Sequence, residues 1–223
     1  MEITKNFTPA SEPQWKSIIV KSKLPKELSC LHEISRNLWW CWNYEAIELF
    51  ESIDLELWEE VEKSPILLLE KVSYARLNEL ANNASFVARL NGLYAKFQAY
   101  MNQPFEYAPS IAYFSMEYGL SNILKIYSGG LGILAGDYLK EASDSRVNMT
   151  AVGLLYRYGY FKQTLSMNGE QQAIYEPQEF QTLPIEEVRD ANGALLYIPI
   201  NMPGRQVQLK VWKAQVGRIS LYL

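Results

Sequence analysis

The segment of this sequence best suited to chemistry is a cluster of glycines, Gly129, Gly130 and Gly132, at the start of a predicted helix. A glycine-rich entry to a helix lets backbone N–H groups approach an anion closely, and the helix N-terminus adds a partial positive charge. The pattern therefore indicates a phosphate site. A tight turn with close helix–sheet packing is the alternative, because the spacing matches neither the dinucleotide motif G-x-G-x-x-G nor a P-loop.

Two charged residues, Glu117 and Arg157, each follow a predicted buried strand. In an α/β fold, that end of a strand faces the ligand crevice. We therefore expect Glu117 either to act in the cleft or to pair with a nearby arginine. Arg157 could meet a phosphate or a sugar hydroxyl, but pairing with Glu117 is the favoured interpretation, since rim ion pairs outnumber ligand contacts.

The residue types present do not form a self-contained catalytic or metal centre. His32 is the sole histidine, no Cys/His cluster has zinc spacing, and no nucleophile motif such as G-x-S-x-G is present. We expect no catalytic residue and no metal ligand in this chain. Cys30 and Cys41 would lie about 16 Å apart on one predicted helix, too far for a disulfide. Reduced thiols favour a cytoplasmic protein.

The composition narrows the possible partners. Apolar residues make up 48% of the 223 residues and charged residues 21%, and the formal net charge is −4, which is ordinary for a globular protein. With no basic run, we expect neither nucleic acid nor an anionic membrane as a partner. No apolar stretch is long enough for a transmembrane helix, and the first residues lack the order of a signal peptide.

The elements that must position these residues change character near residue 105. Before it, apolar residues recur at three- and four-residue steps, which predicts about five short helices. One helix is expected to run from Leu28 to Cys41. Further helices are expected to begin after the N-caps Asp54, Ser64 and Ser73, and a last one to cover Phe86 to Tyr100.

After a linker at Met101–Pro109, the order of predicted elements is strand, loop, helix, strand. The strands are expected at 111–114 and 151–156, and the helix at 131–143 with an apolar face of Leu131, Leu134, Tyr138 and Ala142. This order is typical of a parallel α/β unit.

From Tyr160 the pattern changes to β-hairpins. Turns are predicted at Asn168-Gly169, Asn192-Gly193 and Pro203-Gly204. The stretch RQVQLKVWKAQV alternates, and RISLYL reads as a last strand. Because natural termini are usually polar, we expect a chain that stops in an apolar strand to be truncated.

Three blocks within residues 111–163 match one family in order and spacing: IAYFSMEYGL, IYSGGLGILAGDYLK and AVGLLYRYGYFKQ. They resemble the N-terminal domain of the α-glucan phosphorylases of glycogen and starch. Residues 28–101, with NLWWCWN, ELWEEV and SPILLLEKVS, look like the helical N-terminal region of the bacterial and archaeal branch. Together these blocks extend the resemblance over most of the chain.

The resemblance implies an α/β fold: a helical N-terminal region, 1–105, and then part of the N-terminal lobe of a two-lobed (GT-B type) glycosyltransferase, 106–223, with β-hairpins near the C-terminus. The parent enzyme would release glucose 1-phosphate from α-1,4-glucan with inorganic phosphate and pyridoxal phosphate. The cofactor's lysine belongs to the C-terminal lobe, so we expect this chain alone to be inactive. The family also implies that Gly129 and Gly130 lie at the cofactor, and Gly130 and Leu131 at the phosphate.

Some positions depart from known patterns. Bacterial glycogen synthases, which share the two-lobed fold, have lysine where this chain has Tyr127, so a synthase is a disfavoured alternative. Many phosphorylases of this branch have histidine where Ser121 stands. A free-standing glucan-binding or regulatory module is the other alternative, although such a module would not need a phosphate-type loop.

The run Trp39-Trp40-Cys41-Trp42 offers a further possibility. Its tryptophans cover most of a helix circumference, so they cannot all face one ligand. Core or inter-domain packing is therefore expected rather than a platform for glucan.

Overall fold

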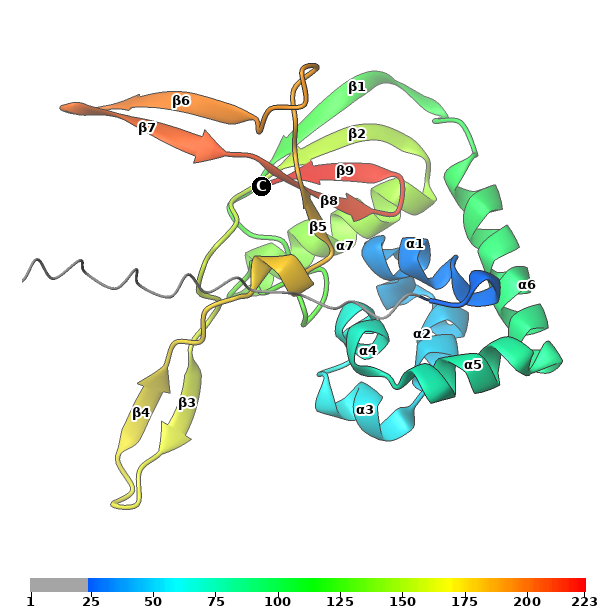
Figure 1. Cartoon of the computed structure of the whole chain (residues 1–223). Coiled ribbons are helices and arrows are strands. Elements are labelled where there is room, and N and C mark those ends of the chain that lie inside the picture. Colours follow the sequence, from blue (N-terminus) through cyan, green and yellow to red (C-terminus); the bar gives the residue numbers. More distant parts are fainter. Residues whose placement is uncertain (1–23) are drawn as a thin grey trace, which may run out of the picture.

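The computed structural model describes residues 24–223, a mixed structure with the helices first and the β-hairpins toward the C-terminus (Figure 1). The predicted α/β class is confirmed at this level. Residues 1–23 lie outside the described residues. They include the start of the predicted helical region and the segment that lacks signal-peptide character.

Helices fill the first part of the described chain and return as α7 between two strands. The α-helices are α1 (Leu31–Arg36), α2 (Tyr44–Glu51), α3 (Leu55–Glu60), α4 (Pro65–Lys71), α5 (Tyr74–Asn82), α6 (Ala84–Met101) and α7 (Gly130–Asp144). Short 3-10 helices are η1 (Lys26–Leu28), η2 (Leu38–Trp42) and η3 (Phe180–Thr182). None of the described helices has both the length and the apolarity needed to cross a membrane.

The predicted helix starts at Asp54, Ser64 and Ser73 are confirmed. Each of these side chains accepts a hydrogen bond from the backbone N–H three residues on, at 3.0, 3.4 and 3.2 Å respectively. Pro65 occupies the first position of α4, where its fixed φ suits the helix and its missing N–H costs no bond. Local capping chemistry therefore determines where α3, α4 and α5 begin.

The single helix predicted from Leu28 to Cys41 is wrong, because the chain breaks at Asn37. This residue is extended, with φ −98° and ψ 119°, and its side chain accepts from the Trp39 N–H to start η2. Its side chain also bonds a distant turn, and that tertiary contact holds it out of the helix. Both cysteines are free thiols in the described chain, as predicted.

The strands form one five-stranded sheet and two separate hairpins. They are β1 (Tyr107–Phe114), β2 (Val147–Val152), β3 (Lys162–Leu165), β4 (Gln171–Ile174), β5 (Ile185–Glu187), β6 (Tyr197–Met202), β7 (Arg205–Lys210), β8 (Trp212–Val216) and β9 (Ile219–Tyr222). The sheet order is β1-β2-β9-β8-β5. Strands β1, β2 and β9 run parallel, whereas β8 is antiparallel to both β9 and β5.

The predicted parallel unit is confirmed, since α7 joins β1 to the parallel strand β2. The second strand was predicted too late, at 151–156, because β2 ends at Val152. There the carbonyl of Val152 accepts from the Ser115 N–H at 3.1 Å and the Tyr118 hydroxyl at 3.0 Å. The loop after β1 therefore closes over the end of β2.

The hairpins β3–β4 and β6–β7 extend away from the body of the molecule (Figure 1). The turn at Asn168-Gly169 is longer than the predicted two residues, because Ser166 still bonds Glu170 across it at 2.9 Å. Pro203-Gly204 does form a two-residue turn, with Gly204 at φ +76°. The alternating stretch after it is divided between β7 and β8, which belong to different sheets.

Two apolar cores lie side by side, and η2 is shared between them. Trp39 and Trp40 belong to the core of the helical part, whereas Leu38 belongs to the core under the sheet. The ring centroids of Trp39 and Phe97 are 5.2 Å apart, and Trp42 packs against both cores. The tryptophan run therefore has the packing role expected of it. A domain boundary near residue 105 remains a proposal.

The two cores are joined by buried hydrogen bonds between Asn37 and Gly217, which lies in the β8–β9 turn. Asn37 Nδ2 donates to the Gly217 carbonyl at 3.1 Å, and the Gly217 N–H donates to Asn37 Oδ1 at 2.9 Å. Both hydrogen bonds are shielded from water, so losing either partner would leave a buried polar group unsatisfied. Asn37 and Gly217 thus attach the helical part to the sheet.

A second set of contacts surrounds this turn. Ser143 Oγ lies 2.5 Å from the Tyr100 hydroxyl and accepts from the Arg218 N–H at 2.8 Å. The Arg218 guanidinium carbon lies 3.6 Å from the centroid of the Tyr100 ring, and Tyr100 donates to Asp144 at 2.7 Å. Helix α6, helix α7 and the β8–β9 turn are therefore joined at one place.

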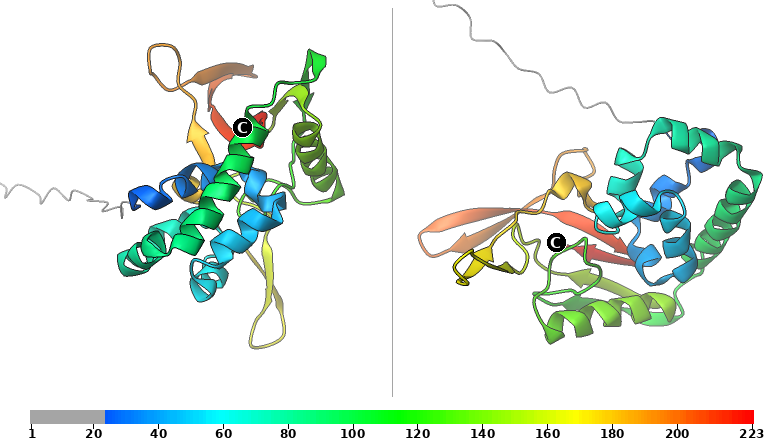
Figure 2. Two further views of the ribbon diagram at one scale, coloured as in Figure 1. Left: turned by 90° about the vertical axis from the view of Figure 1, so that its right-hand side faces the viewer. Right: turned by 90° about the horizontal axis from the view of Figure 1, so that it is seen from below.

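Of the apolar face predicted for α7, only Ala142 is buried. Leu131, Leu134 and Tyr138 are exposed at 80%, 66% and 46%. The buried positions are mostly small: Gly132, Ala135, Gly136, Leu139, Ala142 and Ser143. Small side chains let the loop after β1 and the sheet approach the helix closely, so the larger apolar residues are left on the outer surface. Figure 2 shows α7 and the α1–α6 helices on different sides of the sheet.

We predict that Gly217→Ala destabilises the chain by about 2–4 kcal/mol. The left-handed φ of +56° is unfavourable for alanine, and the added methyl group would collide with Ser143 Oγ and lie 2.8 Å from the Tyr100 hydroxyl. Urea unfolding measures the loss. Gly193→Ala is the matched control, because Gly193 has φ +81° but open space around its Cα. Equal losses for the two variants would contradict the assigned role of the junction.

Candidate functional site

The glycine loop leads directly into α7. Gly129 is the N-cap residue, with extended backbone at φ −157° and ψ −169°, and Gly130 is the first residue of the helix. The first N–H groups of a helix have no acceptor within it, and Gly130 and Leu131 hold those positions. A Cβ built at Gly129 or Gly130 would meet nothing within 4 Å. The start of the helix is therefore exposed, with open space where side chains would otherwise stand.

The alternative interpretation, close packing of the helix, applies to Gly132 and Gly136, which lie against the loop after β1. A Cβ at Gly132 would lie 2.6 Å from Tyr127 Cβ, and one at Gly136 would collide with the backbone carbonyl of Gly119. The Gly119 N–H also donates to the Gly132 carbonyl at 2.7 Å. These glycines therefore differ in their surroundings: Gly129 and Gly130 have open space around them, whereas Gly132 and Gly136 are closely packed. Sequence reasoning did not single out Gly119 and Gly136.

Glu117 lies at the N-terminal end of α7. Its carboxylate accepts from the Ser128 hydroxyl at 2.6 Å. This bond, together with the backbone N–H groups of Ser128 and Gly129, holds the pKa of Glu117 below its ordinary value. The charged carboxylate thus fixes the glycine loop at the start of α7.

The expected pairing of Arg157 with Glu117 is not what the structure shows. The guanidinium carbon of Arg157 lies 5.6 Å from the centroid of the Phe180 ring, and Glu117 is bonded to Ser128 instead. The two residues do follow their strands at the same sheet edge, but a ring contact and a loop contact hold them apart. Because Arg157 is exposed, a ligand role for it stays a proposal.

A cavity of about 310 Å³ lies beside the glycine loop. Its walls are rich in aromatic side chains, and Glu117, Lys125 and Ser128 complete them. The aromatic lining residues are Tyr127, Tyr156, Tyr158, Tyr160, Phe161 and Tyr175. Aromatic faces with a few polar groups suit a ligand that has both apolar faces and hydroxyl groups, as a sugar does.

A second cavity, of about 360 Å³, shares Lys125, Tyr127, Ser128 and Tyr160 with the first. It extends to Glu62 of the helical part. Sequence reasoning missed Lys125 and named only Arg157 as a cationic candidate in this chain. The available signal for Lys125 was its place two residues before Tyr127, in the same loop that carries a lysine in the synthases.

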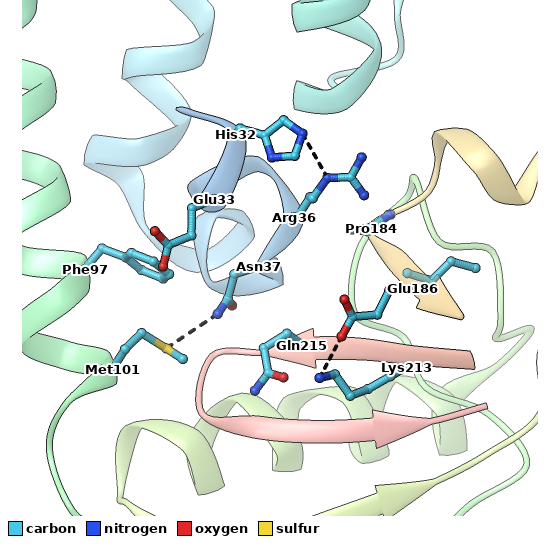
Figure 3. A pocket seen from close by; sticks show the side chains of 11 residues that line it. His32, Glu33, Arg36, Asn37, Phe97, Met101, Pro184, Glu186, Lys213 and Gln215 are labelled. Atoms are coloured by element: carbon cyan, nitrogen blue, oxygen red, sulfur yellow. Dashed lines mark hydrogen bonds and ion pairs between the residues drawn. The ribbon is translucent and has the colours of Figure 1, made fainter. Parts of the chain in front are cut away.

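A larger cavity, of about 500 Å³, lies away from the glycine loop, between α1, α6 and the β5–β8 edge (Figure 3). Its charged groups already have partners: Lys213 pairs with Glu186 at 2.7 Å, and Glu33 accepts from Tyr94 at 2.6 Å. The residues of the glycine loop do not line it. We therefore place the candidate site at the loop and not at this larger cavity.

Metal chemistry has no visible support in the described part of the chain. No group of three or more His, Cys, Asp or Glu residues in residues 24–223 could hold a metal ion. The two thiols are also poor ligands, since burial raises the pKa of Cys30 and raises that of Cys41 to about 11.

Comparison with known proteins identifies relatives over nearly the whole chain. A family model described as a protein of unknown function (DUF3417) matches residues 24–124. Glycogen phosphorylase of Mycobacterium tuberculosis is 41% identical over 218 residues, which cover 92% of this chain and 25% of that protein. Maltodextrin phosphorylase of Thermococcus litoralis is 38% identical over 212 residues, with the same two coverages.

A third relative, glycogen phosphorylase of Aquifex aeolicus, is 38% identical over 197 residues, 86% of this chain and 28% of that protein. The chain thus spans about a quarter of the length of the relatives it matches. Over most of its length, this chain is therefore similar to about a quarter of each of these glucan phosphorylases.

Proposed function

We propose that this chain supplies the phosphate-facing wall of an α-glucan phosphorylase that releases glucose 1-phosphate from α-1,4-glucan. The observation that carries the proposal is the open N-terminus of α7, where Gly130 and Leu131 offer free N–H groups. Phosphorolysis places negative charge in front of such groups, and preorganised N–H dipoles stabilise it without reorganisation. The names of the relatives agree with this reaction.

The loop needs a fixed geometry to do this. Glu117 binds the Ser128 hydroxyl at 2.6 Å, and Gly119 binds the Gly132 carbonyl at 2.7 Å. These bonds hold the loop at both ends against the segment that follows β1. We therefore assign Glu117 to positioning the loop, and Gly129, Gly130 and Leu131 to the anion. Arg157 is proposed for the rim of the site, where a sugar hydroxyl or a phosphate could reach it.

The cofactor of the family, pyridoxal phosphate, fits this chain only in part. The open N–H groups of Gly130 and Leu131 suit its phosphate region, whereas its lysine is expected in the remaining three quarters of the longer enzyme. When bound, the cofactor supplies a phosphate group that assists proton transfer to inorganic phosphate. The part of this chain would be to orient the two anions and to offset their repulsion.

The remaining features are consistent with a glycosyltransferase lobe of the two-lobed type. The sheet order, with α7 between the parallel strands β1 and β2, suits a ligand crevice at the carboxyl ends of the strands. The aromatic cavity beside the loop would receive the glucan. We propose a cytoplasmic enzyme of carbohydrate metabolism with small-molecule and glucan partners, and no nucleic acid or membrane partner.

We predict that the 223-residue chain alone releases no glucose 1-phosphate from glycogen and phosphate. No residue in it matches the family's cofactor lysine, and the described residues supply only one wall of the site. A coupled assay for glucose 1-phosphate, compared with heat-treated chain, measures this. Turnover above that control would favour a complete enzyme of another type. Glycogen binding without turnover would fit both an enzyme fragment and a free-standing module. A parent gene that lacks the lobe with the cofactor lysine would favour the module.

We predict that Gly130→Val in the longer enzyme lowers kcat about 10²–10³-fold and leaves folding nearly unchanged. The valine side chain would enter the open space at the helix start, where it blocks approach to the preorganised N–H groups. Gly132→Val is the contrasting control. Its side chain must displace Tyr127, so its melting temperature should fall. If Gly130→Val is destabilised but catalytically normal, the anion role of the loop is wrong.

A further inference from the structure

The cavity of about 360 Å³ brings together side chains from three segments far apart in sequence. We call it the lysine cavity. Glu62 comes from the turn between α3 and α4, and Lys162 and Tyr160 from the base of the β3–β4 hairpin. The loop before α7 contributes Asn122, Lys125, Tyr127 and Ser128. The helical part therefore contributes directly to a cavity that adjoins the glycine loop.

Lys125 is held in place through its backbone. The buried amide of Gln178 accepts from the Lys125 N–H at 2.8 Å and donates to the Lys125 carbonyl at 3.0 Å. Gly159 packs beneath it, since a Cβ there would lie 2.6 Å from Lys125 Cβ. The Lys125 side chain is 36% exposed, which leaves its ammonium group accessible. Such a fixed backbone with an accessible charge is suited to a ligand.

Glu62 is presented by an unusual backbone. Glu62 and Lys63 are consecutive non-glycine residues with φ of +53° and +62°, a left-handed conformation that is unfavourable for residues with a Cβ. Strain of this kind persists where the surroundings require it and concentrates at functional sites. Here it places the Glu62 carboxylate 3.7 Å from Lys125 Nζ and 3.8 Å from Lys162 Nζ.

The distances from Glu62 to Lys125 and Lys162 leave both ammonium groups able to donate to a further partner. They exceed the 2.7–2.9 Å of a strong charge-assisted hydrogen bond, so Glu62 acts as a shared counter-ion. Lys162 has one tight partner, Glu176 at 2.8 Å, outside the lining of the lysine cavity. Glu176 and Glu62 together raise the pKa of Lys162, which keeps it charged.

We infer that the lysine cavity binds a phosphate group. A doubly charged anion would bond Lys125 and Lys162 together, with the Asn122 amide as a further donor. It would displace Glu62, which lies near both ammonium groups. The inference rests on the proposed function, in which inorganic phosphate is a substrate and glucose 1-phosphate a product. The helical part would then set the affinity for phosphate.

The test is direct binding to the 223-residue chain at constant ionic strength. Inorganic phosphate and glucose 1-phosphate are titrated separately by ³¹P NMR. Lys125→Met and Lys162→Met should each weaken binding about tenfold, as expected for a lost charge-assisted bond. Glu62→Gln should strengthen it about two- to fivefold, because a competing carboxylate is removed. Tighter binding of glucose 1-phosphate would indicate a sugar phosphate that contacts Tyr127 and Tyr160, and equal binding would indicate free phosphate.

Lys63→Met is the matched control. Lys63 adjoins Glu62 in sequence and carries the same charge as the two lysines, but it pairs with Glu59 at 3.2 Å and does not line the cavity. If Lys125→Met does not fold, Lys162→Met, on an exposed strand, carries the comparison.

The inference is overturned if the unaltered chain does not bind either anion, if the lysine variants lose no more affinity than the control, or if Glu62→Gln weakens binding. A purely structural ion cluster predicts that last result. Because turnover is not measured, failure here leaves the proposed phosphorolysis untouched, and a failed activity test of the longer enzyme leaves this binding result in place.

Discussion

The pair of buried hydrogen bonds between Asn37 and Gly217 is the constraint on which the rest of this structure depends. These residues are 180 positions apart; Asn37 lies between α1 and η2, and Gly217 lies in the β8–β9 turn. Because both the donor and the acceptor of the Asn37 side chain are used, the orientation of the helical part relative to the sheet is specified and not merely favoured. That orientation places Glu62 within reach of Lys125 and Lys162. The lysine cavity is therefore a consequence of a contact on another side of the molecule.

Features that depend on local chemistry could be predicted from the sequence. The caps at Asp54, Ser64 and Ser73 were predictable because a side chain three residues from an N–H decides the outcome. The parallel strand–helix–strand unit and the glycine loop were predictable for the same reason, since turn and periodicity signals extend over a few residues. The matching blocks then indicated the family. The sequence blocks could not show which glycines are packed and which are open, because that depends on the contacts of Gly132 and Gly136 with Gly119.

Features that depend on tertiary contacts could not be predicted. The break at Asn37 is hidden by the apolar spacing, which continues through it, and it depends on the contact with Gly217 in addition to the local cap at Trp39. Three of the four residues of the predicted α7 face are exposed, because hydrophobicity suggested the large side chains, whereas the packing required small ones such as Ala142. Lys125 was missed because its place two residues before Tyr127 says nothing about the residues around it in space. Its significance comes from Gln178 and Glu62, which lie at least fifty residues away on either side.

The position of β9 in the sheet has a consequence for how the chain folds. This strand is the last described element, yet it lies between β2 and β8 in the middle of the sheet. When β1 and β2 pair first, one edge of β2 therefore stays unpaired until β9, residues 219–222, pairs with it. Pairing across such a long loop is slow, and an unpaired edge is prone to join other chains. The helical part closes through contacts within its own segment, so it is able to fold first and offer Asn37 as the acceptor for the late β8–β9 turn.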